Sequence, residues 1–446
     1  MGRGSKRDSD GFRTHTAVAE FWATAAAFGT YFSMYGFRKP FVAAAYPQVV
    51  FGWHEKTLLV TAQVLGYMCA KFYGVRRIAQ MRDAERVPGI VLCLAMAELA
   101  WIAFGILPAP WHVLAVFANG FPLGLVFGMV LRFLEGRRHS EAMVAGLCAS
   151  FIVADGVTKS VGTWLLEWGA NPRWMPALAG LLFVPPLALC AALLRQVPPP
   201  GSMDVRQRSE RIPMDRRRRI EFLIHHAPMV TMLVTVHVVV TVLRSLRADF
   251  APEIWQGLGA TLYATLFTRT ETLIAFLVLV LHGLGVFVHD NRRALQVTLL
   301  VCLAACLLVT GSATAFWAEK TTALGVMVAI GFGLYVPYVA MHTSLFERLI
   351  AWTGDRANVA FLLYCADAIG YLGYVAVVLL RETIFSSAPS PQTTAQFFLV
   401  GSAAGGVVLA GLFATALVYV TVNPRSRWPG RAAIASGGPY SEEEQT

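Results

Sequence analysis

Apolar stretches of about 20 residues recur along the whole chain, and this pattern limits the possible folds more than any other feature. A helix of that length crosses the ~30 Å hydrocarbon core of a bilayer. A membrane β-barrel would instead show segments of about ten residues with alternating polarity. Only 14% of the 446 residues are charged, whereas soluble domains carry roughly 25%. The pattern therefore predicts an all-α polytopic membrane protein.

The apolar stretches predict about twelve transmembrane helices in two groups of six. We expect the first group near residues 16–46, 56–75, 87–107, 111–133, 142–167 and 174–195. We expect the second group near 221–248, 265–288, 294–317, 322–348, 357–381 and 394–422. The chain then divides into a cytoplasmic N-terminal segment (1–15), a six-helix bundle (16–196), a basic cytoplasmic linker (197–220), a second bundle (221–422) and a disordered cytoplasmic tail (423–446).

Positively charged residues gather in alternate loops. When the N-terminus is placed in the cytoplasm, Arg76 and Arg77, Arg292 and Arg293, and the run Arg216–Arg219 all fall on that side. The opposite loops contain at most one basic residue each. Such a bias sets the orientation of helical membrane proteins. We therefore expect a multi-pass protein of the cell membrane (inner or plasma membrane) with both termini in the cytoplasm.

The formal net charge of +10 arises mainly from these orienting loops, so we do not expect nucleic acid as a partner. All seven cysteines lie inside apolar runs without CxxC spacing, which is typical of small core residues. The sequence shows no paired carboxylates, nucleophile and base set, or metal-ligand spacing at one membrane face. We therefore expect no enzymatic activity, no metal site and no cofactor.

Ionisable residues inside the predicted helices are the candidates for function. A charge at the middle of a membrane costs at least about 2.5 to 3.5 kcal/mol, so such residues are rare and are usually functional. Their grouping on a few helices favours one polar centre within the bundle. The candidates are Arg38, Lys39, Lys71, Asp155, Lys159, Arg244, Arg247, Asp249 and Asp367.

Simpler roles remain open for some of these charges. Arg38 and Lys39 suit an anchor at the outer membrane interface. Lys71 lies near the cytoplasmic end of its helix and suits a side chain that extends to that interface. Asp155 and Lys159 are four residues apart and suit a pair that neutralises itself on one helical face.

Other features favour structural roles. Gly120, Gly124 and Gly128 recur every four residues on the fourth predicted helix. This spacing lets two helices approach closely. Glu98 and Glu271 also lie inside predicted helices but have no supporting context, and we interpret them as packing or interfacial residues.

Four short segments carry recognisable motifs. They are Tyr35-x-x-Arg38-Lys39-x-Phe41-x-x-x-x-x-Pro47, Gly66-Tyr67-x-x-x-Lys71-Phe72-x-Gly74, Leu243-Arg244-x-x-x-x-Asp249-x-x-Pro252 and Gly370-Tyr371-Leu372-Gly373. With two six-helix halves and a basic linker, these segments resemble the organophosphate:phosphate antiporters of the major facilitator superfamily. The resemblance implies the major facilitator fold with two pseudo-symmetric halves. It also implies that Arg38 and Arg244 bind the phosphate of the substrate.

The chain departs from the antiporter pattern in two places. The loop after the second helix reads Gly74-Val75-Arg76-Arg77 and lacks the usual aspartate. The position of the family's fifth-helix histidine holds Asp155, and Lys159 is an added cation. Closer similarity to an uncharacterised bacterial branch rests on Leu134-Glu135-Gly136-Arg137-Arg138 and Phe346-Glu347-Arg348-Leu349. That branch supplies no substrate.

From the resemblance we predict a secondary active transporter that moves a small organic anion, either phosphate or a phosphate ester, by alternating access with anion exchange. A doubly charged anion between Arg38 and Arg244 would accept paired hydrogen bonds from both guanidinium groups. We expect a monomer whose partners are this substrate and the lipid bilayer. The expected substrate-binding residues also include Lys39, Lys71, Lys159, Tyr35 and Tyr371, and the expected coupling or charge-balance residues are Asp155, Asp249, Asp367 and Arg247.

Two alternatives fit the same residues. The first is proton-coupled transport of another organic anion, with Asp155 or Asp367 as the titrating group. The second is a transporter-like sensor that binds phosphate esters and signals to a partner.

Overall fold

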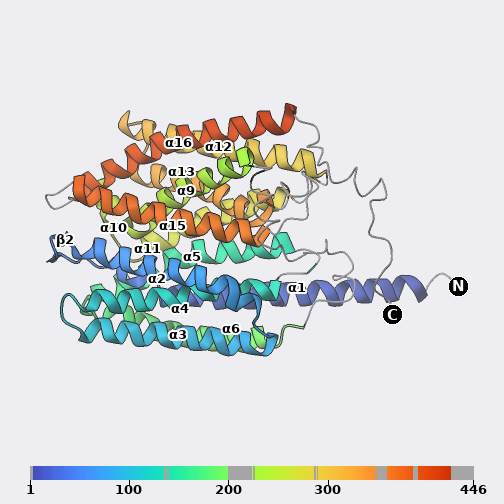
Figure 1. Cartoon of the computed structure of the whole chain (residues 1–446), viewed down its shortest axis with the longest axis horizontal. Coiled ribbons are helices and arrows are strands. Elements are labelled where there is room, and N and C mark those ends of the chain that lie inside the picture. The colour runs from blue at the N-terminus through green and yellow to red at the C-terminus, as the bar shows by residue number, and fades with distance from the viewer. Residues whose placement is uncertain are drawn as a thin grey trace.

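The long helices form two bundles that lie side by side. A computed structural model of the chain describes residues 4–134, 137, 140–198, 224, 227–285, 288, 290–346, 348, 359–384 and 390–422. Most of the predicted linker, including Arg216–Arg219, and the predicted tail lie outside the described residues. In Figure 1 the helices of the first bundle occupy the lower part of the molecule, and most of the second bundle lies above them.

Each bundle contains six long helices within the described residues. The first consists of α1 (Gly4–Gly36), α2 (Glu55–Ala79), α3 (Asp83–Ile106), α4 (His112–Leu134), α5 (Ser140–Glu167) and α6 (Met175–Arg195). The second consists of α9 (Ala227–Asp249), α11 (Thr265–Leu284), α12 (Asn291–Trp317), α13 (Ala323–Ala340), α15 (Val359–Ile384) and α16 (Pro391–Val422).

Five short elements complete the fold within the described residues. A 3-10 helix, η1 (Pro40–Ala43), follows α1, and α10 (Ala251–Gly257) follows α9. A π-helix, η3 (Met341–Leu345), extends α13. The strands β1 (Val49–Val50) and β2 (Trp53–His54) pair antiparallel. This hairpin and α10 lie at the same end of the molecule, at the left in Figure 1, which we call the hairpin end.

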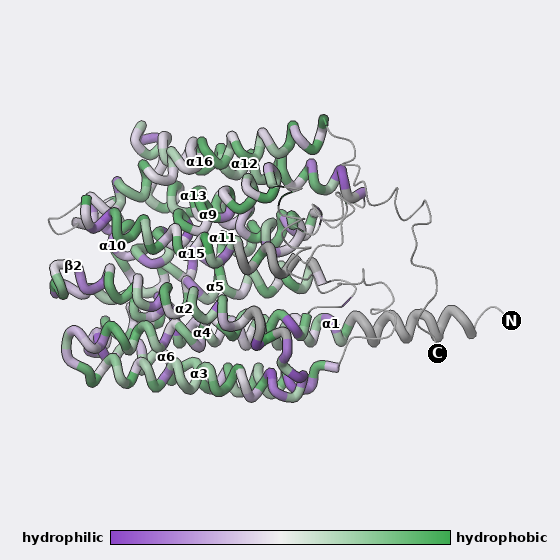
Figure 2. Tube along the Cα trace, in the orientation of Figure 1, coloured by the Kyte–Doolittle hydropathy of each residue, from purple (hydrophilic) through white to green (hydrophobic). Residues whose placement is uncertain are grey.

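The outer surface of the bundles is apolar. Among the described residues, nine helices are long and apolar enough to cross a membrane, and Figure 2 shows hydrophobic residues along most of their length. Leu99 and Leu189 are 64% and 62% exposed, as expected for side chains that contact lipid rather than water. The other three long helices are α1, α2 and α15, and α2 and α15 carry the charged residues Lys71 and Asp367. The prediction of an all-α polytopic protein is confirmed.

The first predicted helix, 16–46, has different boundaries in the structure. The helix begins at Gly4 and ends at Gly36, so Arg38 and Lys39 lie in the turn before η1. The physical reason is Pro40, which has no N–H group and whose ring clashes with the carbonyl group of the residue four positions earlier. The break therefore presents the Arg38 side chain from a turn instead of from a regular helix.

Side chains from three helices bind the backbone carbonyl groups that this break releases. The Trp101 indole donates to the Phe37 carbonyl oxygen at 2.6 Å, and Asn119 donates to the same oxygen at 3.1 Å. The Gln63 amide donates to the Arg38 carbonyl oxygen at 2.9 Å. Non-helical backbone within a membrane bundle is stable only with such partners. These bonds fix the position from which Arg38 extends.

Other predicted boundaries shift by smaller amounts. The helix predicted over 322–348 is α-helical only to Ala340 and continues as η3. The helix predicted over 265–288 ends at Leu284, with Gly285 as its C-cap.

Helices α2 and α4 pack closely through glycines, as their spacing predicts. A Cβ atom built at Gly120 would lie 2.1 Å from the Gln63 carbonyl oxygen, and one at Gly124 would lie 2.6 Å from the Tyr67 carbonyl oxygen. A real Cβ atom does not approach a backbone oxygen so closely, so these helices would have to separate. The packing role of Gly120 and Gly124 is therefore confirmed.

We expect Gly120→Ala to destabilise the protein by about 1 to 3 kcal/mol, because overpacking forces the backbones of α2 and α4 apart. The matched control is Gly311→Ala, since a Cβ at Gly311 has no heavy atom within 4 Å. Both variants gain the same helix propensity from alanine. Thermal unfolding of the purified proteins measures the difference, and equal midpoints for the two variants would contradict the packing role.

Candidate functional site

A small cavity lies between the two bundles and contains most of the predicted site residues. Its volume is about 10 Å³, which is room for about one water molecule. In this structure the cavity is therefore too small for a ligand of several atoms. The lining residues are Tyr31, Tyr35, Arg38, Tyr67, Lys71, Phe127 and Phe151 from the first bundle and Arg244, Tyr338, His342, Asp367 and Tyr371 from the second.

Arg38 reaches this cavity from the turn after α1. Its guanidinium carbon lies 4.2 Å from the ring centre of Tyr67 and 5.6 Å from that of Tyr35. The residue is only 6% exposed. Contact with aromatic faces stabilises a guanidinium group without neutralising its charge.

Arg244 reaches the cavity from α9 in a similar setting. Its guanidinium carbon lies 4.3 Å from the ring centre of Tyr338 and 6.0 Å from that of Tyr335. The residue is 9% exposed. Each bundle therefore contributes one buried arginine held against two tyrosines of the same bundle, as expected for two halves related by an internal repeat.

Both arginines lack a carboxylate partner among the described residues. The structure shows no ion pair to Arg38 or Arg244 there. The buried Nε atoms of both residues have no hydrogen-bond partner in the same part of the chain, and Arg244 donates only a long bond of 3.4 Å to the Ser245 hydroxyl oxygen. A buried charge without a partner is costly. The described residues thus supply no counter-ion for either guanidinium group.

The Lys39 ammonium group has a carboxylate partner, unlike the guanidinium group of the neighbouring Arg38. It donates to the Asp249 carboxylate, which also accepts a hydrogen bond from the Tyr374 hydroxyl at 2.8 Å. A second pair, Lys56 with Glu253, joins the same two bundles nearby. Lys39 and Asp249 do not line the cavity. These ion pairs hold the bundles together at the hairpin end.

Two further predicted charges form a pair within α5. Lys159 lies 2.6 Å from Asp155 on the same face of the helix, so the two residues form an ion pair. The Lys159 ammonium group also donates to the Ala248 carbonyl oxygen at 2.9 Å, across the two bundles. Neither residue lines the cavity.

Arg247 also lies outside the cavity lining. It donates to Glu271 at 2.7 Å and to the Met327 carbonyl oxygen. Glu271 packs against Gly156 of α5, in agreement with a packing role, and its carboxylate also neutralises the buried Arg247. Glu98 is 9% exposed and lies against Gly180 of α6, in agreement with a packing role.

Lys71 belongs to a cluster of four ionisable residues, three of which line the cavity. Its ammonium group donates to Asp367 at 3.2 Å across the two bundles, and it is 3% exposed. The Lys71 side chain is therefore buried between the bundles and does not extend to the membrane interface. Asp367 also contacts His237 at 2.9 Å and His342 at 3.6 Å.

Sequence reasoning missed both histidines, although it had a signal for them. His237 and His342 lie inside the predicted helices 221–248 and 322–348. The cost of polar groups within a membrane applies to histidine as well. Applying that rule to histidine as well as to lysine, arginine and aspartate would have identified both residues.

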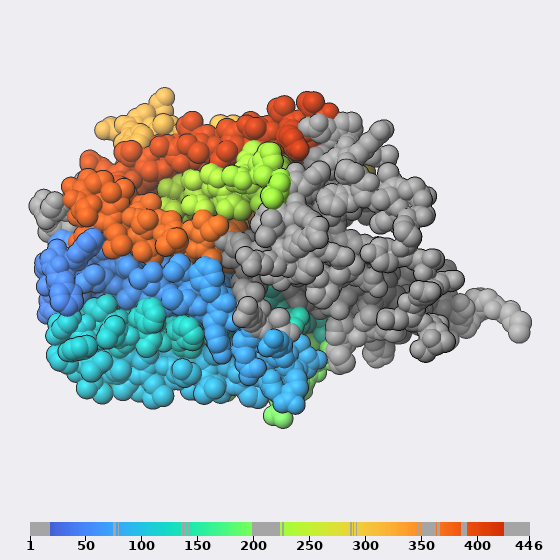
Figure 3. Space-filling view, in the orientation of Figure 1, coloured from blue at the N-terminus to red at the C-terminus, as the bar shows by residue number. Residues whose placement is uncertain are grey.

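The two bundles meet directly along α2 and α15. These helices pack against each other, and in Figure 3 the blue surface of α2 lies against the orange surface of α15 on the visible face. Helices α5 and α11 form another contact between the bundles. The cavity is therefore enclosed by helices of both bundles.

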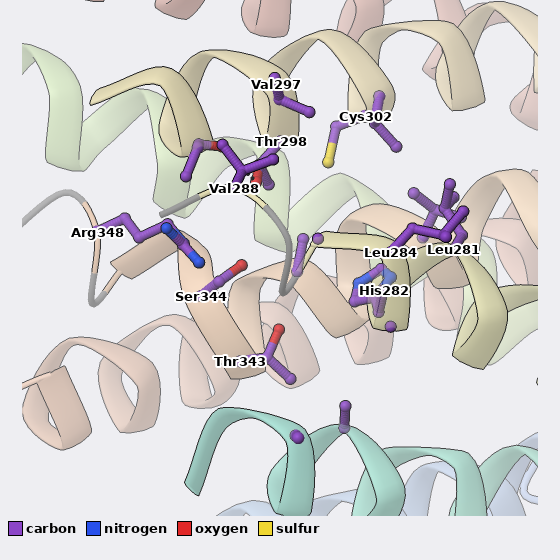
Figure 4. A pocket seen from close by; sticks show the side chains of 18 of the residues that line it. Leu281, His282, Leu284, Val288, Val297, Thr298, Cys302, Thr343, Ser344 and Arg348 are labelled. Atoms are coloured by element: carbon purple, nitrogen blue, oxygen red, sulfur yellow. Dashed lines mark hydrogen bonds between the residues drawn. The ribbon is translucent and has the colours of Figure 1, made fainter. Parts of the chain in front are cut away.

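A second cavity, of about 240 Å³, lies between α5, α11, α12 and α13. Its lining is mostly apolar, with His282, Thr298, Ser344 and Arg348 among the polar residues (Figure 4). None of the predicted site residues, all of which are described, contributes to it. The larger space therefore lies apart from the arginine pair.

Comparisons with known proteins support the fold. A family model described as "Family of unknown function (DUF5690)" matches residues 40–422. No curated protein matches the sequence. Similar solved structures include a D-xylose-proton symporter, with 14% identity, a TM-score of 0.58 and coverage of 89% of this chain and 97% of that one.

Two other solved structures show the same similarity. A bacterial homolog of the human lysosomal transporter Spinster, in an inward-facing and unoccupied conformation, has 14% identity, a TM-score of 0.57 and coverage of 92% and 99%. The human organic anion transporter MFSD10 (TETRAN) has 14% identity, a TM-score of 0.52 and coverage of 90% and 99%. At this level of identity the likeness establishes the major facilitator fold and no substrate.

Proposed function

We propose that this chain, which belongs to the DUF5690 family of unknown function and has the major facilitator fold, is a secondary transporter of a small organic anion. Phosphate or a phosphate ester is the proposed substrate class. The observation that carries this proposal is the arginine pair, Arg38 and Arg244, one from each bundle, facing one cavity without a carboxylate partner among the described residues. Transport, rather than catalysis, is the proposed activity.

Arginine suits phosphate better than lysine does. Its planar group donates two parallel hydrogen bonds to two oxygens of one anion. A phosphate group has enough oxygens to accept such a pair from each side. Lys71, Tyr35 and Tyr371 line the same cavity and would contact the rest of the ligand. We assign Lys39 and Lys159 to contacts between the bundles, because their ammonium groups are bonded there.

The positions of the ion pairs support alternating access. Lys39 with Asp249 and Lys56 with Glu253 connect the bundles at the hairpin end, which the predicted topology places outside the cell. Rocking one half against the other around a central site is the usual motion of this fold. Opening toward the outside would break these pairs, and closing would form them again.

Electrostatics supports anion exchange as the mode of transport. Two guanidinium groups brought together in a low-dielectric site repel each other. A doubly charged anion between them removes this repulsion, so the loaded protein closes more easily than the empty one. The return step then needs an anion as well.

Exchange can be measured with purified protein in proteoliposomes. We expect rapid uptake of radiolabelled phosphate into vesicles loaded with phosphate, and uptake slower by about tenfold or more into vesicles without it, because the empty site resists closure. Vesicles without protein give the background. Equal uptake in loaded and unloaded vesicles would exclude exchange, and no uptake with phosphate or its esters would exclude the proposed substrate class.

A further inference from the structure

The cavity is lined by a histidine, His342, whose side chain is only 3% exposed and whose hydrogen bonding leaves one ring nitrogen free to accept a proton. His342 lies on η3, where a π-helix replaces the last turn of α13. Its Nδ1 atom is 2.9 Å from the Tyr338 carbonyl oxygen. A carbonyl oxygen only accepts hydrogen bonds, so Nδ1 carries the hydrogen. In the neutral ring the other nitrogen, Nε2, is then a bare acceptor.

That bare nitrogen faces another acceptor. His342 Nε2 lies 3.6 Å from Oδ1 of Asp367. A neutral Nε2 places its lone pair toward an acceptor oxygen, which is unfavourable. A protonated Nε2 instead forms an ion pair with the carboxylate at this distance, and a small approach would bring the two atoms within hydrogen-bond distance.

The neighbouring histidine is in a different state. His237 Nε2 lies 2.9 Å from the same Asp367 oxygen, and its Nδ1 has no partner among the described residues. A neutral ring with the hydrogen on Nε2 already satisfies that bond. His237 thus orients Asp367 without an added proton, which singles out His342.

The surroundings of His342 contain few other groups that change charge near neutral pH. The two histidines are the groups whose ordinary range falls there. Lys71 already neutralises Asp367 from the other bundle. The titratable and charged groups facing the cluster are Tyr31 and Tyr35 of α1, Arg38 after α1, Tyr67 and Lys71 of α2, Cys148 of α5, His237 and Arg244 of α9, Tyr338 of α13, and Asp367 and Tyr371 of α15.

We propose that His342 Nε2, with Asp367, is the binding site of a proton that is carried together with the anion. The inference rests on the proposed function, because it names the coupling ion of the same cavity. The proton enters from water on the side to which the cavity opens, bonds to Nε2, and leaves from Nε2 to water on the other side. Protonated His342 adds a positive charge to the cavity of Arg38 and Arg244, so proton and anion strengthen each other's binding.

The coupling is measured as phosphate affinity between about pH 5.5 and about pH 8, in wild type and in His342→Gln. The glutamine amide donates to Asp367 permanently and does not titrate. We expect the ratio of the two affinities to change by about fivefold or more over this range. Binding of one ligand typically changes the affinity for a coupled ligand by at least about this factor. The titration of phosphate itself cancels in the ratio.

The matched control is His282→Gln. His282 is a partly buried histidine that lines the second cavity, so this variant should keep the wild-type pH dependence of phosphate affinity. Solid-state NMR of isotope-labelled histidine tests the site without any ligand. We expect His342, identified by its loss in His342→Gln, to carry its hydrogen on Nδ1 at high pH and to gain the second proton within the same range.

The outcomes separate the two proposals. If phosphate binds and the affinity ratio stays constant with pH, the coupling is wrong while the anion site stands. If NMR shows the hydrogen on Nε2 at high pH, or no titration of His342, the proton site is wrong. If His342 titrates as expected but neither protein binds phosphate or its esters, the proton site stands and the proposed substrate class is wrong.

Discussion

Replacing Arg38 or Arg244 with lysine is expected to lower phosphate affinity by about 10- to 100-fold and to slow exchange in parallel. Lysine keeps the positive charge but provides a single point donor instead of a planar pair. The loss of one charge-assisted hydrogen bond is worth about 1.5 to 3 kcal/mol, and each 1.4 kcal/mol is about tenfold in affinity. Because each arginine comes from a different bundle, the two variants should have similar effects.

The matched control is Arg269→Lys. Arg269 lies on α11 and is exposed, away from the cavity, so its replacement should leave binding and exchange unchanged. Thermal unfolding confirms that each variant is folded. Wild-type exchange in both cavity variants would refute the arginine pair as the anion site, and loss in only one of them would refute its symmetric use.

Breaking the buried pair between Lys39 and Asp249 is expected to have the second large effect. The variant Asp249→Asn keeps an oxygen that accepts from Tyr374 but leaves the Lys39 ammonium group without its carboxylate. Removing one partner of a buried ion pair costs about 3 to 5 kcal/mol. The free energy of unfolding, measured by titration with a denaturing detergent, should fall by this amount. The double variant with Lys39→Met should recover most of it, because no unpaired charge remains.

A surface pair provides the comparison. Asp83 is 77% exposed at its side chain and pairs with Arg86 at the start of α3. The Arg86 side chain is 15% exposed, but the Asp83 carboxylate is solvated. A pair with a solvated partner contributes about 0 to 1 kcal/mol, so Asp83→Asn should change stability little. If Asp249→Asn were equally mild, the contact between the bundles at the hairpin end would not depend on this ion pair.

The sequence predicted the number and order of the long helices because length and apolar composition decide whether a helix can lie in a membrane. It predicted less well where helices break. Pro40 marked the end of the first helix, yet the apolar residues after it continued the pattern and extended the predicted helix to 46. The extended prediction failed because the turn is stabilised by Trp101, Asn119 and Gln63, which are distant in sequence.

The candidate charges could be found from the sequence, but their division into paired and unpaired groups could not. Hydropathy identifies Arg38, Lys39 and Arg244 as equally misplaced in a membrane. Pairing depends on which side chains meet across the two bundles, as Lys39 meets Asp249 at a sequence separation of 210. No local pattern contains that information, and the same is true of the contact between Asp367 and His342.

The sequence by itself determined that this chain is a helical membrane protein, because each span buries its own backbone hydrogen bonds and needs only sufficient apolar length. The tertiary structure decided which charges are neutralised within the fold and which face the cavity. Lys39, Lys71, Lys159 and Arg247 have carboxylate partners, whereas Arg38 and Arg244 have none among the described residues. The physical reason is that electrostatic pairing acts over a few ångströms in space, whatever the separation along the chain.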